Sequence, residues 1–113
     1  MTGEGTSLSL HALDTVTGRP CAGLGFALFR LEEETAHPLA HGETDADGRW
    51  SHPGALAPGS YELRFAAGAW QTARGRDGFY DLIPIRFRLA PGSARAHVPL
   101  LLAPFGYTTY RGS

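Results

Sequence analysis

The sequence predicts an all-β fold, a two-sheet antiparallel sandwich with one short helix. Several short segments alternate between apolar and polar residues with a period of two, which is the periodicity of a half-buried β-strand. The 113 residues include 15 glycines and 8 prolines, which divide the chain into short pieces joined by turns. The alternating segments number seven or eight, so we expect that many short strands. The one segment that suits a helix has room for two turns at most.

The first two predicted strands are residues 7–13 and 25–31. In the first, the period of two directs Leu8, Leu10 and Ala12 towards the core and leaves His11 on the opposite, polar face. Residues rich in glycine and proline between the two strands predict a turn. Both faces of the second strand are largely apolar, so we expect another subunit to cover one of them.

The middle of the chain predicts a loop, a short strand and a tight turn. Residues 32–36 are polar and predict a loop, and residues 39–44 predict a short strand. Asp47 and Gly48 then form a hairpin signal, because an Asp-Gly pair adopts the positive backbone angles of such turns. Arg49 follows directly and projects from the end of this turn.

The second half of the chain predicts the strongest strand and the only helix. Residues 60–66 alternate without interruption, with the aromatic and aliphatic side chains inward and the charged ones outward. Residues 68–75 contain helix formers between two glycines, and residues 83–89 form a further alternating strand. A final pair of strands, joined by a Pro-x-Gly turn, occupies residues 96–113, with His97 on the face opposite an apolar row.

Composition indicates one globular domain, residues 7–113, after a flexible leader of residues 1–6. Hydrophobic residues make up 42% of the chain and charged residues 19%, which is typical of a globular protein. The net charge is −1 and no Lys/Arg cluster is present, so we expect no nucleic-acid partner. The single cysteine, Cys21, excludes an intrachain disulfide. The polar leader is not a signal peptide and no segment is long enough to span a membrane, so we expect a cytoplasmic protein.

Two segments of the chain carry the motif of a known family. Residues 97–107 read His-Val-Pro-Leu-Leu-Leu-Ala-Pro-Phe-Gly-Tyr, and the chain closes on Tyr-Arg-Gly-Ser at residues 110–113. Residues 11–20 begin His-Ala-Leu-Asp and continue to Thr-Gly-Arg-Pro. This pattern resembles the transthyretin-like 5-hydroxyisourate hydrolases. The resemblance implies a transthyretin-like sandwich whose short helix follows the fifth strand, and a homotetramer built as a dimer of dimers with active sites between the dimers.

The resemblance also implies an activity and a set of site residues. The family hydrolyses 5-hydroxyisourate to 2-oxo-4-hydroxy-4-carboxy-5-ureidoimidazoline in urate degradation, and needs no cofactor. Its polar active-site set maps onto His11, Arg49, His97 and Ser113. Tyr110 and Arg111 are expected to bind substrate together with His11 and Arg49.

The chemistry of these side chains suits the reaction. Water must lose a proton as it attacks a ring amide, and imidazole is the side chain able to accept it near neutral pH. A cation such as Arg49 can bind an oxygen-rich substrate and stabilise the charge that develops on the carbonyl oxygen. We favour His97 as the base and His11 as the residue that positions water or substrate, although the sequence leaves that order open. Ser113 offers a hydroxyl group, but no Ser-His-acid order supports a covalent nucleophile.

The sequence does not favour a metal site. Asp45, Asp47 and Gly48 resemble the start of a calcium loop, but Leu56 stands where the twelfth loop position requires Glu. The remaining histidines, His37, His41 and His52, do not have the spacing of a zinc site. We interpret these residues as polar loop and strand positions.

The sequence allows two alternatives to an enzyme. The first is a small-molecule carrier, because transthyretin shares the fold and carries hydrophobic ligands through its central channel. Carrier transthyretins, however, lack the Tyr-Arg-Gly-Ser ending and have no histidine at the positions of His11 and His97. The second is a generic sandwich domain for adhesion, which would need no polar cluster at the terminus. The sequence therefore favours the hydrolase.

Overall fold

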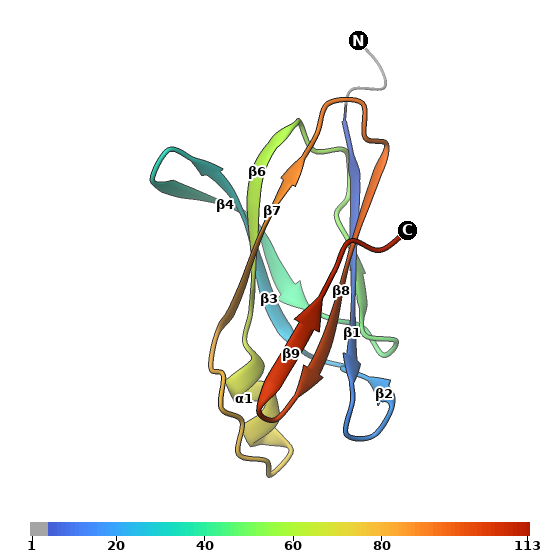
Figure 1. Ribbon diagram of the computed structural model, residues 1–113, viewed down its shortest axis with the longest axis vertical. Helices are drawn as coiled ribbons and strands as arrows, with labels where there is room; N and C mark the ends of the chain where they lie inside the picture. The colour runs from blue at the N-terminus through green and yellow to red at the C-terminus, as the bar shows by residue number, and fades with distance from the viewer. Residues whose placement is uncertain (1–4) are drawn as a thin grey trace.

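The computed structural model describes residues 5–113 as a sandwich of two sheets with one helix at its end (Figure 1). This confirms the predicted all-β class and the single short helix. The elements are, in order, β1 (Ser7–Asp14), β2 (Arg19–Pro20), β3 (Gly25–Glu32), β4 (Thr35–Glu43), β5 (Arg49–Ser51), β6 (Gly59–Phe65), α1 (Ala67–Ala73), β7 (Ile83–Leu89), β8 (Arg95–Ala103) and β9 (Gly106–Thr109). In this part of the chain, no helix is long and apolar enough to cross a membrane.

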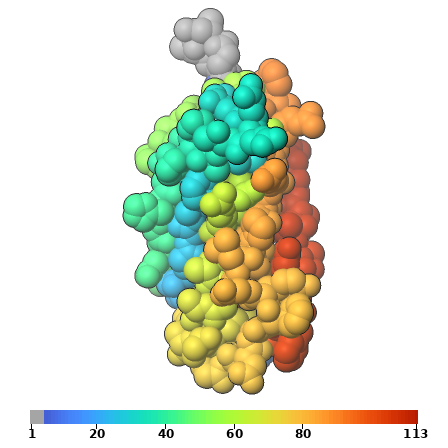
Figure 2. Space-filling view, turned by 90° about the vertical axis from the view of Figure 1, so that its left-hand side faces the viewer, coloured from blue at the N-terminus to red at the C-terminus, as the bar shows by residue number. Residues whose placement is uncertain are grey.

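The first sheet contains the two strands that carry the candidate histidines. Its order is β2-β1-β8-β9, and β5 also pairs with β1. The second sheet has the order β4-β3-β6-β7. Figure 2 shows the second sheet, with its strands lying side by side from cyan to orange.

One strand pair departs from the predicted antiparallel arrangement. β1 and β8 run parallel, with Ser9 opposite His97 and His11 opposite Pro99, whereas every other pair between named strands is antiparallel. The predicted antiparallel sandwich is thus confirmed, with this one parallel pair as its exception. The alternation of side chains defines which face of a strand is buried but carries no information about strand direction.

The core lies between the two sheets, where the alternation of the sequence placed it. Leu8, Leu10 and Ala12 of β1 are buried, as are the inward residues of β6. Glu62 points outward from β6 as predicted, yet it is also buried. The Nε groups of Arg64 and Arg86 each donate to its carboxylate at 2.5 Å, and these two side chains cover it.

The predicted loop at residues 32–36 is wrong, and so are the bounds of the strand that follows it. β4 begins at Thr35 and pairs with β3 through a tight turn in which Glu33 adopts a positive φ of 57°. The register shifts between Leu28 and Phe29, where Leu39 has no partner on β3. The polar residues favoured a loop locally, but pairing with the neighbouring strand overrides that weak local preference.

The start of the domain lies earlier than predicted. Of the expected flexible leader, residues 1–4 lie outside the described residues. Thr6 belongs to the folded domain, because it is fully buried and its backbone exchanges hydrogen bonds with that of Leu56 at 2.8 and 2.9 Å.

A buried ion pair attaches the segment after α1 to the end of β1. The carboxylate of Asp14 accepts hydrogen bonds from the two terminal nitrogens of Arg76 at 2.9 and 2.8 Å. It also accepts from the hydroxyl group of Thr17 at 2.8 Å and from the backbone N–H of Val16 at 3.1 Å. The hydrogen bond from Arg76 is the main reason that the pKa of Asp14 lies below its usual value.

Candidate active site

The candidate site lies on the outer face of the first sheet, where β5, β1 and β8 are neighbours. Residues at alternate positions of a strand share a face, so Ser7, Ser9 and His11 of β1 point away from the core. On β8 the same alternation brings Arg95 and His97 to this face. Because Ser9 pairs with His97 and His11 pairs with Arg49, the polar residues of three strands are gathered in one place.

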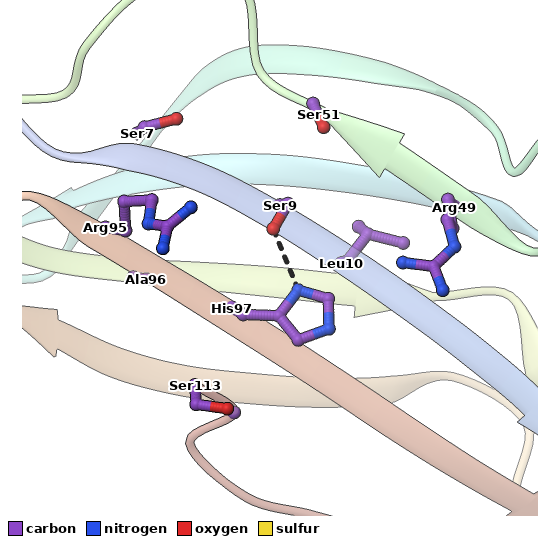
Figure 3. Close-up of a pocket in the computed structure, with 10 residues that line it drawn as sticks. Ser7, Ser9, Leu10, Arg49, Ser51, Arg95, Ala96, His97 and Ser113 are labelled. Carbon is purple, nitrogen blue, oxygen red and sulfur yellow. Dashed lines mark hydrogen bonds between the residues drawn. The ribbon is translucent and has the colours of Figure 1, made fainter.

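His97 is held on two sides. Its Nδ1 atom lies 2.8 Å from the Oγ atom of Ser9, at hydrogen-bond distance. Its backbone carbonyl accepts a hydrogen bond from the N–H of Gly112 at 2.8 Å, which brings the C-terminal segment back against β8. Figure 3 shows the ring between Ser9 and Ser113, with the guanidinium group of Arg49 on the same side of the sheet.

A pocket of about 320 Å³ surrounds the imidazole of His97. It brings together three of the four predicted catalytic residues, Arg49, His97 and Ser113. Its full lining is Ser7, Ser9, Leu10, Arg49, Ser51, Arg95, Ala96, His97, Gly112 and Ser113. Within residues 5–113 neither Arg49 nor Arg95 forms a side-chain ion pair, so both guanidinium groups are available to an anionic or oxygen-rich ligand.

The turn before β5 positions Arg49. The carboxylate of Asp45 accepts hydrogen bonds from the backbone N–H groups of Asp47 and Arg49, both at 2.9 Å. Gly48 has a φ of +72°, and a Cβ atom there would lie 2.5 Å from the carbonyl oxygen of Ala12. A turn is thus present before Arg49, and Asp45 accepts the hydrogen bonds that shape it. The predicted hairpin is not formed, because β4 and β5 on either side of the turn belong to different sheets. Among the described residues, no group of three or more potential ligands is arranged to hold a metal ion.

His11 lies beside the pocket rather than in its lining. Burial, followed by the positive charge of Arg49 and the proximity of His97, lowers the pKa of His11 below its usual value, and Asp47 opposes this only in part. The neutral form of His11 therefore persists to a lower pH than that of an ordinary histidine. Its place next to Arg49 suits a residue that orients substrate or water.

The structure does not place Tyr110 and Arg111 with the other predicted residues. Both line a second, more apolar pocket of about 240 Å³, between β7 and the beginning of β8. The C-terminal segment separates the two pockets, since Gly112 and Ser113 face the first one. Ala96 and His97 line both pockets.

The sequence interpretation missed Ser9, Arg95 and Ser51 as pocket residues. The signal for Ser9 and Arg95 was present, because each shares a strand face with a candidate histidine. Ser51 shares the face of Arg49 in the same way. Cys21, in contrast, is buried away from the site, and burial raises the pKa of its thiol to about 12, so it stays protonated.

Gly112 provides a direct test of the packing around His97. A Cβ atom at Gly112 would lie 2.6 Å from Cδ2 of His97 and 3.1 Å from Cγ of Pro99. We expect Gly112→Ala to displace the imidazole and to lower kcat at least tenfold, because small displacements of a catalytic group are costly. Gly106→Ala is the control for a lost glycine, since nothing lies within 4 Å of its Cβ position and its backbone does not adopt a positive φ. Steady-state rates and thermal midpoints of both variants check this, and an unchanged kcat in Gly112→Ala would refute it.

Comparison with known proteins decides the family. The HIUase/Transthyretin family matches residues 8–112, nearly the whole chain. The chain belongs to this family. The resemblance seen in residues 11–20 and 97–113 is thereby confirmed.

Within the family, the chain is similar to both 5-hydroxyisourate hydrolases and transthyretins. It is 43% identical to 5-hydroxyisourate hydrolase 2 of Rhizobium meliloti (strain 1021), over 94% of this chain and 95% of that protein. Among solved structures, the 5-hydroxyisourate hydrolase of Klebsiella pneumoniae superposes with a TM-score of 0.84 at 37% identity, over 96% and 94% of the two chains. Sea bream transthyretin in complex with thyroxine superposes with a TM-score of 0.83 but at 27% identity, over 93% of each chain. The fold is common to both groups, while the sequence is more similar to the hydrolases.

Proposed function

We propose that this protein hydrolyses 5-hydroxyisourate to 2-oxo-4-hydroxy-4-carboxy-5-ureidoimidazoline in urate degradation, with water activated by His97. The observation that carries the proposal is the pocket in which His97, Arg49 and Ser113 meet. The family membership and the similarity to enzymes that carry this name support the same reaction.

The proposed reaction begins with removal of a proton from water by the imidazole of His97. The oxygen of that water forms a bond to the carbonyl carbon of the ring amide, and negative charge develops on the carbonyl oxygen. Arg49 stabilises this charge, because its guanidinium group faces the pocket and no acidic side chain in the described part of the chain pairs with it. The C–N bond then breaks, and the protonated imidazole returns its proton to the leaving nitrogen.

His11 and Ser113 complete the proposed site. His11, kept neutral by its lowered pKa, orients water or substrate beside Arg49. The hydroxyl group of Ser113 lies at the wall of the pocket and binds a polar atom of the substrate. Tyr110 and Arg111 line the neighbouring pocket, and the backbone hydrogen bond from Gly112 to His97 holds the C-terminal segment against β8.

The direct test is the decay of freshly prepared 5-hydroxyisourate, followed by its ultraviolet absorbance with and without the protein. We expect a catalysed decay proportional to protein concentration. Binding of the substrate without acceleration would favour the alternative, a carrier without catalysis.

We further propose a homotetramer, a dimer of dimers, located in the cytoplasm. The catalytic face of the first sheet is open in a single chain, and a second subunit over it would exclude water from the pocket. An aromatic cluster of Phe79, Tyr80 and Tyr107 offers a separate surface for the second type of contact between subunits. The ring centroids of Phe79 and Tyr80 lie 5.0 Å apart, and those of Tyr80 and Tyr107 lie 5.3 Å apart. All three side chains are exposed. The free thiol of Cys21 suits a reducing compartment.

Sedimentation analysis at micromolar concentration is expected to give the mass of four chains. We expect substitution of Phe79 by a charged residue to lower that mass and the activity together. A wild-type monomer with full activity would contradict the proposed assembly.

A further inference from the structure

Ser9 makes the only side-chain hydrogen bond to the imidazole of His97 in the described part of the chain. Its Oγ atom lies 2.8 Å from Nδ1 of His97. The contact follows from the parallel pairing of β1 and β8, which places the two residues directly opposite each other. Both side chains project to the same face of the sheet, as Figure 3 shows.

The tautomer of His97 decides whether it can act as a base towards the pocket. A neutral imidazole carries one N–H and one free lone pair. If Nδ1 carries the proton and donates it to Ser9, the lone pair lies on Nε2 and is free to accept a proton from water. If Ser9 donates to Nδ1 instead, Nε2 carries the hydrogen and cannot act as the base.

The packing of the ring favours one orientation. Gly112 lies against the opposite edge of the ring, close to Cδ2 of His97. Rotating the ring by half a turn would exchange Nδ1 and Cδ2, and the hydrogen bond to Ser9 would be lost. The glycine on one edge and the serine on the other therefore leave Nε2 as the nitrogen that faces the pocket.

We propose that Ser9 is a positioning residue that holds His97 in the Nδ1–H tautomer and directs Nε2 towards the reacting water. This inference rests on the proposed role of His97 as the base. A hydroxyl group serves this purpose differently from the carboxylate that orients histidine in many enzymes. It accepts a hydrogen bond from the Nδ1–H group without adding a negative charge beside Arg49, so the attraction of the pocket for an oxygen-rich substrate is retained.

The tautomer can be measured without substrate. Long-range proton–nitrogen correlation spectra of the protein with ¹⁵N-labelled histidine distinguish the two neutral tautomers, and His97→Asn identifies the signals of His97. We expect the Nδ1–H form to dominate in the wild type and to lose that dominance in Ser9→Ala. A wild-type His97 in the Nε2–H form, or identical tautomer populations in Ser9→Ala, would overturn the proposal. This readout is independent of activity, so it separates a failure of the inference from a failure of the proposed function.

Kinetics supply the second readout. We expect Ser9→Ala to lower kcat by about tenfold to a hundredfold with little change in KM, because the geometry of the base is lost while the binding groups remain. Ser9→Thr keeps the hydroxyl group and is expected to restore most of the rate. Ser60→Ala, a serine on β6 of the other sheet, is the control and should behave as the wild type. A kcat of Ser9→Ala equal to that of the wild type, or a loss in Ser9→Thr as large as that in Ser9→Ala, would remove Ser9 from this role.

Discussion

We expect His97→Ala to lower the turnover of 5-hydroxyisourate by a factor of about 10² to 10⁴, the usual contribution of a general base. The substitution should leave the fold intact, because His97 is only partly buried and lies on the outer face of the first sheet. His97→Asn is a closer match in size and can still meet Ser9, but it has no group that accepts a proton from water. We therefore expect it to be as inactive as His97→Ala.

The matched control is His41→Ala, which removes a histidine from β4 in the other sheet. Its rate should equal that of the wild type. The pH dependence provides a separate check: kcat/KM of the wild type should fall on acidification, because a protonated base cannot accept a proton from water, and the residual rate of His97→Ala should not. Near wild-type turnover in His97→Ala, or a flat wild-type profile between about pH 5 and 8, would remove His97 from the role of base.

The second large effect concerns stability. We expect Asp14→Asn to lower the free energy of unfolding by about 2–3 kcal/mol, and the thermal midpoint by about 10 °C. Asp14 is 3% exposed, and its carboxylate receives two hydrogen bonds from Arg76. Asparagine would turn an amide group towards the guanidinium and leave its charge without a partner. Urea denaturation of the two proteins at neutral pH measures the difference.

The pH dependence of this difference follows from the lowered pKa of Asp14. A carboxyl group with a pKa lower in the folded than in the unfolded chain stabilises the fold above its unfolded pKa, and this contribution is lost as the pH falls through the folded pKa. The advantage of the wild type over Asp14→Asn should thus be constant above about pH 5 and shrink below about pH 4. If the wild type remained more stable than Asp14→Asn by the same amount below about pH 2, the stabilisation could not come from the ionised carboxylate of Asp14.

The exposed pair of Arg30 and Glu32 is the control for this experiment. Its atoms lie 3.3 Å apart on side chains that are 32% and 57% exposed. Glu32→Gln is expected to change the free energy of unfolding by less than about 0.5 kcal/mol, since exposed ion pairs contribute little. A loss as large as that in Asp14→Asn would mean that burial does not explain the effect at Asp14.

By itself, the sequence determined the class of the fold, the family and the outward face of each site strand. The alternation around Leu10 and Val98 identified the buried rows, and therefore the opposite face that carries His11 and His97. These properties follow from local geometry, because a period of two places alternate side chains on opposite faces whatever the strand pairs with. The turn before Arg49 was likewise predicted from local backbone preference, but the hairpin expected there was not formed, because β4 and β5 belong to different sheets.

Only the tertiary structure decided which strands are neighbours and in what direction they run. The parallel pairing of β1 with β8 places Ser9 against His97, although 88 positions separate them in the sequence. The return of Gly112 to β8 divides the terminal residues between two pockets, and the pairing of Arg76 with Asp14 joins segments 62 positions apart. Such contacts depend on the packing of the whole sandwich, since the pattern within a strand specifies its buried face and leaves its partner and direction to the rest of the fold.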